Sequence, residues 1–123
     1  MSAPEWLHHA FGFEERTRVL DGGRLSHGEM ETGHGIVMLA TPSPDYEGPR
    51  RHREHCESAR AWSTVPWVVD GVLVYVDDVD AHHRRAVLAG ATILTPPEAG
   101  EPGRRYRAED PEGHRRMFLE HRR

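Results

Sequence analysis

The sequence predicts an α+β domain assembled from two copies of one supersecondary unit. Gly12 and Gly35 are 23 residues apart, and Gly90 and Gly113 are separated by the same interval. In both halves the predicted order is helix, glycine, strand, turn, strand, turn, strand. Self-similarity at a fixed offset indicates a duplicated unit. The chain has 123 residues, the length of about one such domain.

The first unit opens with a short helix. Ser2 is placed to cap its first turn, and Gly12 is placed to end it in a left-handed conformation. Alternating segments separated by Asp21-Gly22-Gly23 and by further glycines then predict three strands. The predicted elements of this unit are a helix over residues 4–11 and strands over residues 14–20, 24–31 and 36–40.

The second unit contains the clearest turn in the chain. Asp110-Pro111-Glu112-Gly113 fits a type I turn, in which the first side chain accepts a backbone hydrogen bond and proline fixes φ at the second position. The acidic segment 77–80 lies where a helix is predicted to start, and its carboxylates suit the free N–H groups there. The predicted elements are strands over residues 71–76 and 92–94, a helix over residues 81–88, a loop over residues 96–103 and a hairpin over residues 104–120.

The two units are joined by a long connection without apolar periodicity. Residues 41–67 contain Pro42, Pro44 and Pro49 and a charged run at 50–54, which predicts a loop. A loop of this length in a compact domain usually has a function. Trp62 and Trp67 lie in it, and either cover an edge of the core or contact a ligand. The predicted division is module one at residues 1–42, a linker at residues 43–69 and module two at residues 70–123.

Composition excludes several classes of function. The formal net charge is −4, so there is no overall attraction to nucleic acid or to an anionic membrane. No apolar run approaches the roughly 18 residues that a membrane span needs. Cys56 is the only cysteine, which excludes an internal disulfide and a cysteine-based metal site. We expect a cytoplasmic protein.

Three segments of the second half carry a resemblance to a known family: VYVDDVDA at residues 74–81, AGA at residues 89–91 and YRAEDPEGHR at residues 106–115. Together with AFGFE at residues 10–14, they resemble the vicinal oxygen chelate superfamily, in its glyoxalase/bleomycin resistance protein/dioxygenase branch. The resemblance implies paired βαβββ modules, each curling a sheet around a cleft, and usually a homodimer.

The resemblance also implies a strand before the first helix. In the second unit this strand is predicted at residues 71–76, but its counterpart in the first unit would fall before Met1. We therefore expect the first strand to be missing, through a truncated start or because a partner subunit covers the edge. A sheet without that strand exposes an unpaired edge.

Enzymes of this superfamily typically hold a divalent ion with His or Glu on the first and last strands of each module. By resemblance, the corresponding positions here are Leu39, Gly71 and Met117. None carries a hard ligand atom suited to Mg²⁺, Mn²⁺ or an ordinary Zn²⁺ site. The sequence predicts no inherited metal site and no cofactor.

The same strand faces are then expected to form an apolar floor. Alternation places Leu73 and Tyr75 with Arg115 and Met117, and the duplicated unit adds Leu39. This surface suits a partly aromatic small molecule, although the side chains would equally suit core or dimer packing. The predicted ligand-binding residues are Leu39, Trp62, Trp67, Leu73, Tyr75, Arg115 and Met117.

Three functions remain open at this point. The first is a metal-independent small-molecule binding protein whose ligand resembles an antibiotic, as the resemblance implies. The second is a metal-dependent lyase or dioxygenase-like enzyme of the same superfamily. The third is a non-catalytic accessory domain that acts through dimerisation. No catalytic residue is predicted.

Overall fold

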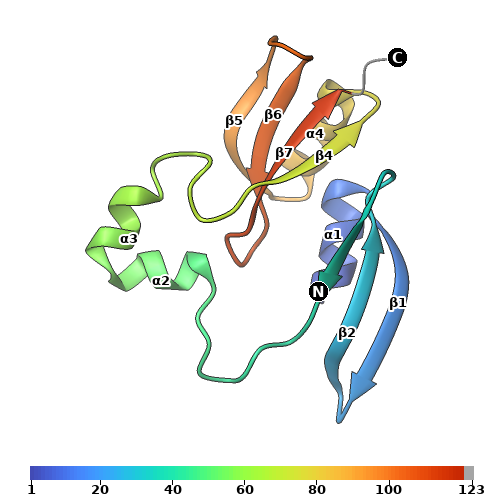
Figure 1. Ribbon diagram of the computed structural model, residues 1–123, viewed down its shortest axis with the longest axis vertical. Helices are drawn as coiled ribbons and strands as arrows, with labels where there is room; N and C mark the ends of the chain where they lie inside the picture. Colours follow the sequence, from blue (N-terminus) through green and yellow to red (C-terminus); the bar gives the residue numbers. More distant parts are fainter. Residues whose placement is uncertain (121–123) are drawn as a thin grey trace.

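Two sheets lie side by side in the protein, and a separate pair of short helices projects from the second one (Figure 1). The computed structural model describes residues 1–120. Within residues 1–120, none of the helices has the length and hydrophobicity of a membrane-spanning segment. The elements are α1 (Ala3–Phe11), β1 (Glu14–Asp21), β2 (Arg24–Glu31), β3 (Ile36–Leu39), α2 (Pro49–His55), α3 (Glu57–Trp62), β4 (Val72–Val76), α4 (Val79–Leu88), β5 (Thr92–Glu98), β6 (Arg105–Glu109) and β7 (Arg115–Glu120).

The predicted α+β architecture of paired modules is confirmed. The first sheet has the order β1-β2-β3 and the second has the order β4-β7-β6-β5. The second sheet has one strand more than the first: β4, which pairs in parallel with β7. In the first sheet β3 occupies the place of β7, and among residues 1–120 no strand pairs with its outer edge as β4 pairs with β7. The described residues therefore lack the strand that was expected to be missing from the first module.

The helix caps follow the sequence prediction. Ser2 accepts a hydrogen bond at its side chain from the Glu5 N–H, and Gly12 ends α1 with φ 75°. In α4 the Asp78 carboxylate accepts from the Ala81 N–H at 3.0 Å. The Gly113 N–H donates to the Asp110 carbonyl at 2.9 Å, which closes the predicted turn.

The core lies between the two helices and one face of each sheet. Phe11 of α1 contacts Phe118 of β7 with ring centroids 4.8 Å apart, and Phe118 stacks on Tyr106 of β6 at 5.0 Å. Aromatic contacts therefore join the two modules. The other buried core residues are Leu7, Ala10, Phe13, Met30, Val74, Val79, Ala86 and Ala108.

Two polar side chains of α4 also bind the first module. His82 Nε2 lies 2.8 Å from the Phe11 carbonyl, and its Nδ1 lies 2.6 Å from the Tyr106 hydroxyl. A ring that donates from Nε2 to Phe11 accepts from Tyr106 at Nδ1, which is the neutral tautomer. Arg85 donates to the carbonyls of His8 and His9 at the end of α1. The bonds to His9 and Phe11 satisfy carbonyls at the end of α1 that the helix leaves free, whereas the His8 carbonyl also accepts from the Gly12 N–H.

The linker contains two helices that the sequence pattern did not predict. No residue of α2 is buried, so α2 has no apolar stripe by which it could be recognised. The strand prediction at residues 92–94 was also too short, because β5 continues to Glu98 through Pro96 and Pro97. This is an edge strand, where proline is tolerated because no neighbour needs its N–H.

Candidate functional site

One face of the second sheet gathers four of the predicted binding residues. Leu73 is the register partner of Met117, and Tyr75 is the partner of Leu119. Arg115 lies two residues before Met117 on the same strand and so on the same face. The opposite face carries Val74 and Phe118, which pack in the core. We call the face that bears Leu73, Tyr75, Arg107, Arg115 and Met117 the sheet face.

The sheet face is partly open to solvent. Leu73 is 46% exposed and Tyr75 is 37% exposed. Across the sheet, Arg107 is the register partner of Met117, and its guanidinium carbon lies 5.8 Å from the centre of the Trp67 ring. Trp67 is therefore brought to the sheet face by a cation–π contact.

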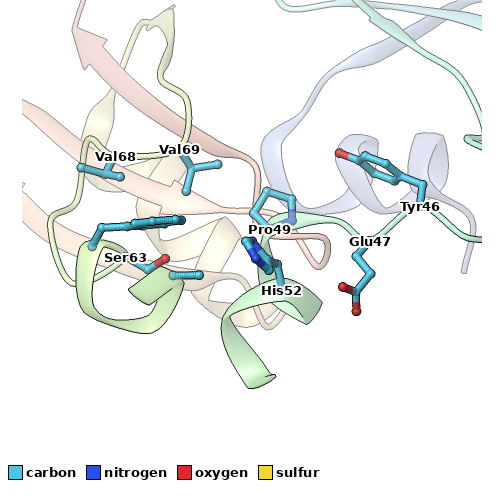
Figure 2. Close-up of a pocket in the computed structure, with 9 residues that line it drawn as sticks. Tyr46, Glu47, Pro49, His52, Ser63, Val68 and Val69 are labelled. Atoms are coloured by element: carbon cyan, nitrogen blue, oxygen red, sulfur yellow. The ribbon is translucent and has the colours of Figure 1, made fainter. Parts of the chain in front are cut away.

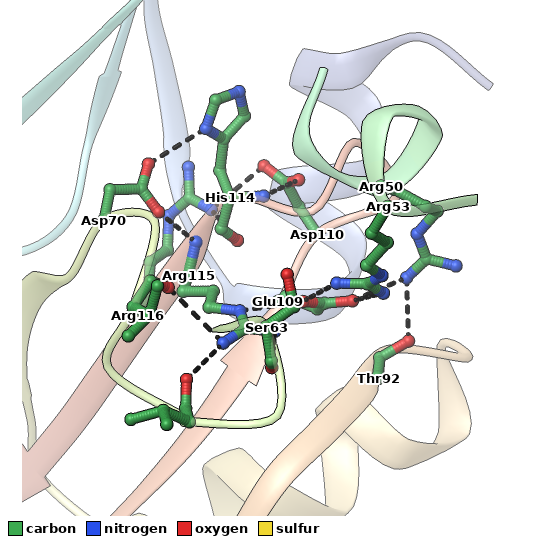
Figure 3. Close-up of polar contacts among 12 residues, drawn as sticks. Arg50, Arg53, Ser63, Asp70, Thr92, Glu109, Asp110, His114, Arg115 and Arg116 are labelled. Carbon is green, nitrogen blue, oxygen red and sulfur yellow. Dashed lines mark hydrogen bonds and ion pairs between the residues drawn. The ribbon is translucent and has the colours of Figure 1, made fainter. Parts of the chain in front are cut away.

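The Arg115 side chain is buried and hydrogen-bonded to other residues of the protein. It is 3% exposed, and its Nε donates to Glu109 at 3.1 Å. Its terminal nitrogens donate to the carbonyls of Ser63, Val65 and Val68 in the linker. These bonds occupy all three guanidinium nitrogens, so in this arrangement Arg115 fixes the linker against β7 (Figure 3).

Glu109 binds three arginines, two from α2 and one from β7. Arg50 and Arg53 of α2 donate to its carboxylate at 3.2 Å and 2.5 Å, beside Arg115. Glu109 is fully buried. Burial alone would raise the pKa of this carboxyl group, but hydrogen bonds and charges from Arg53 and Arg115 outweigh burial and leave the pKa lowered. The ionised carboxylate therefore binds α2 to the second sheet.

Arg116 occupies the core face, where an apolar residue is expected. Its Nη1 donates to the Asp110 carboxylate at 3.0 Å and to the His114 carbonyl at 3.3 Å. Its guanidinium also lies 5.8 Å from the Phe11 ring centre. The charge is thus paired with Asp110, and this arginine stabilises the β6–β7 turn from inside.

Leu39 does not share the sheet face, and the prediction that it does is wrong. In the β2–β3 register Val37 pairs with Met30, which is buried in the core. Leu39 lies two residues further along β3 and packs against the same core. It also lines a cavity of about 640 Å³ between α1, the first sheet and the β6–β7 turn.

The physical reason is a difference in loop length. Four residues, 32–35, connect β2 to β3, whereas five residues, 110–114, connect β6 to β7. Matching Gly35 to Gly113 therefore shifts β3 by one residue, and a shift of one residue exchanges the two faces of a strand. Met38 corresponds to Met117 when the strands are matched, and it is 71% exposed.

Trp62 lies in a different place from the sheet face. It ends α3 and lines a cavity of about 320 Å³ that is built from linker residues alone. Its indole makes an edge contact with the imidazole of His52, with centroids 6.2 Å apart. We call this cavity the linker pocket; its lining is Tyr46, Glu47, Pro49, His52, Ala59, Trp62, Ser63, Val68 and Val69 (Figure 2).

The strand positions that resemblance assigns to a metal do not fit one. Leu39 and Gly71 offer no side-chain ligand atom, and Met117 offers thioether sulfur, as does Met38, which corresponds to Met117 when the strands are matched. Mg²⁺ and Mn²⁺ prefer oxygen ligands, and Zn²⁺ sites take imidazole, thiolate or carboxylate groups. Among residues 1–120, no three His, Cys, Asp or Glu side chains are grouped closely enough to hold a metal ion.

Two residues that matter here were missed at the sequence level. Arg107 alternates with Tyr106 and Ala108, so strand alternation alone was enough to place it beside Met117. Glu109 had no comparable signal, because its partners Arg50 and Arg53 are more than fifty residues away in the chain.

The chain matches known proteins over nearly its whole length. The family model described as Glyoxalase/Bleomycin resistance protein/Dioxygenase superfamily matches residues 2–118. The crystal structure of TioX from Micromonospora sp. ML1 is 30% identical, with a TM-score of 0.68, and the match covers 98% of this chain and 86% of TioX. TnmS3, an antibiotic binding protein from Streptomyces sp. CB03234, is 18% identical, with a TM-score of 0.64 and coverage of 96% and 83%. The TnmS3 likeness shows the fold alone. No match was found among curated proteins.

Proposed function

Because the chain belongs to the glyoxalase/bleomycin resistance protein/dioxygenase superfamily, we propose that it is a metal-independent protein that binds a small, partly aromatic, antibiotic-like molecule. The observation that carries the proposal is the sheet face. Exposed Leu73 and Tyr75 lie beside Met117, and Arg107 stacks with Trp67 at its edge. Apolar side chains with few polar groups are typical of small-molecule sites.

The chemistry of the sheet face favours a flat ligand with an acceptor group. Trp67 and Tyr75 offer aromatic surface, and Arg107 offers a guanidinium that packs on the Trp67 ring. A guanidinium that stacks on one face keeps its N–H groups in the plane free to donate. Binding by burial plus one charge-assisted hydrogen bond needs no metal. That TnmS3 is an antibiotic binding protein agrees with this class of ligand.

A homodimer is part of the proposal. The outer edges of β3 and β4 are unpaired among the described residues. The loop before β3 lies next to β4, since the ring centroids of His34 and Tyr75 are 5.9 Å apart. Met38 and Leu73 expose apolar surface along these edges. Unpaired apolar edges favour pairing with a second chain. The single Cys56 suits a cytoplasmic location.

Calorimetric titration with metal-free bleomycin and with a panel of aromatic antibiotics tests the proposal. A ligand that binds should show weakened affinity for Tyr75→Ala and for Arg107→Gln, by about tenfold for each lost contact. Leu88→Ala is the control, since Leu88 is 88% exposed on α4. Equal affinity in all four proteins would place binding elsewhere and contradict the sheet face as the site.

The enzyme alternative depends on a metal. Stoichiometric Ni, Zn, Mn or Fe in the protein after gentle purification would favour the enzyme. Ligand-binding heat that appears in the titration only after metal is added would support the same conclusion. A protein that binds no member of the panel yet dimerises would favour the accessory-domain alternative.

A further inference from the structure

The linker pocket is separate in construction from the sheet face. Its lining comes from residues 46–69 only, whereas the sheet face is built from strands β4, β6 and β7. Figure 2 shows Val68 and Val69 together on one side and Pro49 and His52 of α2 facing them. At about 320 Å³ the cavity is within the range of small-molecule sites.

Both walls of the pocket are anchored to the same buried ion pair. The α2 wall is held by Arg50 and Arg53, which donate to Glu109. The opposite wall is held by Arg115, whose Nη groups donate to the carbonyls of Ser63 and Val68 at 2.8 Å and 3.3 Å. Arg115 also donates to Glu109, so a ligand would meet walls that are already in position. Such preorganisation lowers the entropic cost of binding.

The backbone is strained where it lines the pocket. Val69 has a φ of 89°, which is sterically unfavourable for a β-branched residue. Residues of this kind persist where neighbouring bonds hold them, and they cluster at ligand sites. Here Val68 is held by Arg115, and the Asp70 carboxylate accepts from the Arg115 N–H at 2.7 Å. The strained residue places a 44% exposed apolar side chain in the pocket lining.

His52 brings an imidazole to the pocket, next to its aromatic and apolar residues. Its imidazole contacts the rings of Trp62 and His55. Neither ring nitrogen of His52 is hydrogen-bonded to another residue within the described range 1–120. Pro49, Ala59, Trp62, Val68 and Val69 give the pocket its apolar and aromatic surface, and Tyr46, Glu47 and Ser63 complete the lining with polar groups. The Glu47 carboxylate already lies 2.7 Å from His55 Nε2. A neutral imidazole has one acceptor nitrogen, which suits a ligand N–H.

We propose that the linker pocket is a second binding site, which takes a flat aromatic molecule of one or two rings bearing an N–H group, of the size of indole. The ring packs on Trp62 and against the wall of Val68 and Val69, and the N–H donates to His52. This site is independent of the proposed sheet-face ligand, and either one stands if the other fails.

The test is a titration with 5-fluoroindole followed by ¹⁹F NMR on the full chain. Saturable binding is expected, and Trp62→Ala should raise Kd about tenfold, the effect of losing an aromatic contact of roughly 1.4 kcal/mol. His52→Phe keeps a ring but removes the acceptor, so it should weaken 5-fluoroindole and leave 5-fluoro-1-methylindole unchanged. Leu88→Ala is the control.

Val69→Gly keeps the test decisive if Trp62→Ala is unstable. Glycine adopts positive φ without strain, so the melting temperature should stay the same or rise while Kd increases several-fold. Absence of saturable binding at millimolar probe would overturn the proposal. A Kd that is unchanged in both Trp62→Ala and His52→Phe would also overturn it. So would binding that is lost in Met117→Ala but kept in Trp62→Ala and His52→Phe, because that result would place the probe on the sheet face.

Discussion

Glu109 and Arg115 face each other across β6 and β7, and the Arg115 side chain donates a 3.1 Å hydrogen bond back to the Glu109 carboxylate. Both side chains are buried, at 0% and 3% exposure. The pair is the point at which the second sheet, α2 and the linker loop meet.

Glu109→Gln should strongly destabilise the protein. It leaves the buried Arg115 without a countercharge, and breaking a buried pair costs about 3 to 5 kcal/mol. Urea denaturation gives the free energy of unfolding, and Glu98→Gln, on the exposed end of β5, is the matched control. A loss below about 1 kcal/mol would show that the cluster does not hold the linker.

Gly113→Ala should cost more than Gly90→Ala, although both glycines have positive φ, 93° and 85°. A left-handed residue with a side chain costs about 1–2 kcal/mol in either case. At Gly113 a Cβ would also lie 2.6 Å from the Arg50 backbone nitrogen, whereas at Gly90 it meets nothing within 4 Å. The difference in unfolding free energy between the two variants measures that clash; equal values would argue against close contact of α2 with the turn.

Stability should fall as the pH drops below about 6.5, the ordinary pKa of histidine. Burial lowers the pKa of His82 in the folded protein, so the unfolded chain takes up the proton first. The contribution of His82 to stability is therefore complete above the ordinary histidine pKa, and it is lost as the pH falls toward the lower pKa that His82 has in the folded protein. Thermal unfolding at pH 7.5 and 5.5 should show a smaller loss for His82→Gln than for the wild type. An equal loss would assign the effect to other groups.

Met38→Arg should shift the protein toward monomer. Met38 is 71% exposed on the edge strand β3, and a charge there opposes edge pairing. Sedimentation velocity measures the change, with Leu88→Arg on α4 as the control. A wild-type monomer at high concentration would contradict the proposed dimer.

Prolonged treatment with EDTA should leave the melting temperature unchanged, because the strand positions compared above offer thioether and hydrocarbon groups rather than hard ligands. Scanning calorimetry before and after chelation, with metal analysis of both samples, is the measurement. A lower melting temperature that zinc or manganese restores would reveal a site built from other residues.

Alternation along β7 was enough to place Arg115 and Met117 on one face and Phe118 on the other, since a strand reverses side with every residue. The same rule failed for Leu39, because it was applied from a glycine whose loop is one residue shorter than its counterpart. Ser2, Gly12, Asp78 and the turn at Asp110 act over a few residues, so their roles were predictable from local sequence.

The sequence by itself determined what is local or periodic: the duplicated order of elements, the helix caps, the hairpin turn and the faces of the second sheet. Only the tertiary structure decided which face of β3 looks inward, how α2 is held, and where Trp62 and Trp67 lie. These depend on a one-residue register and on a buried carboxylate that draws arginines from distant segments. Long-range pairing of that kind leaves no spacing signal in the chain.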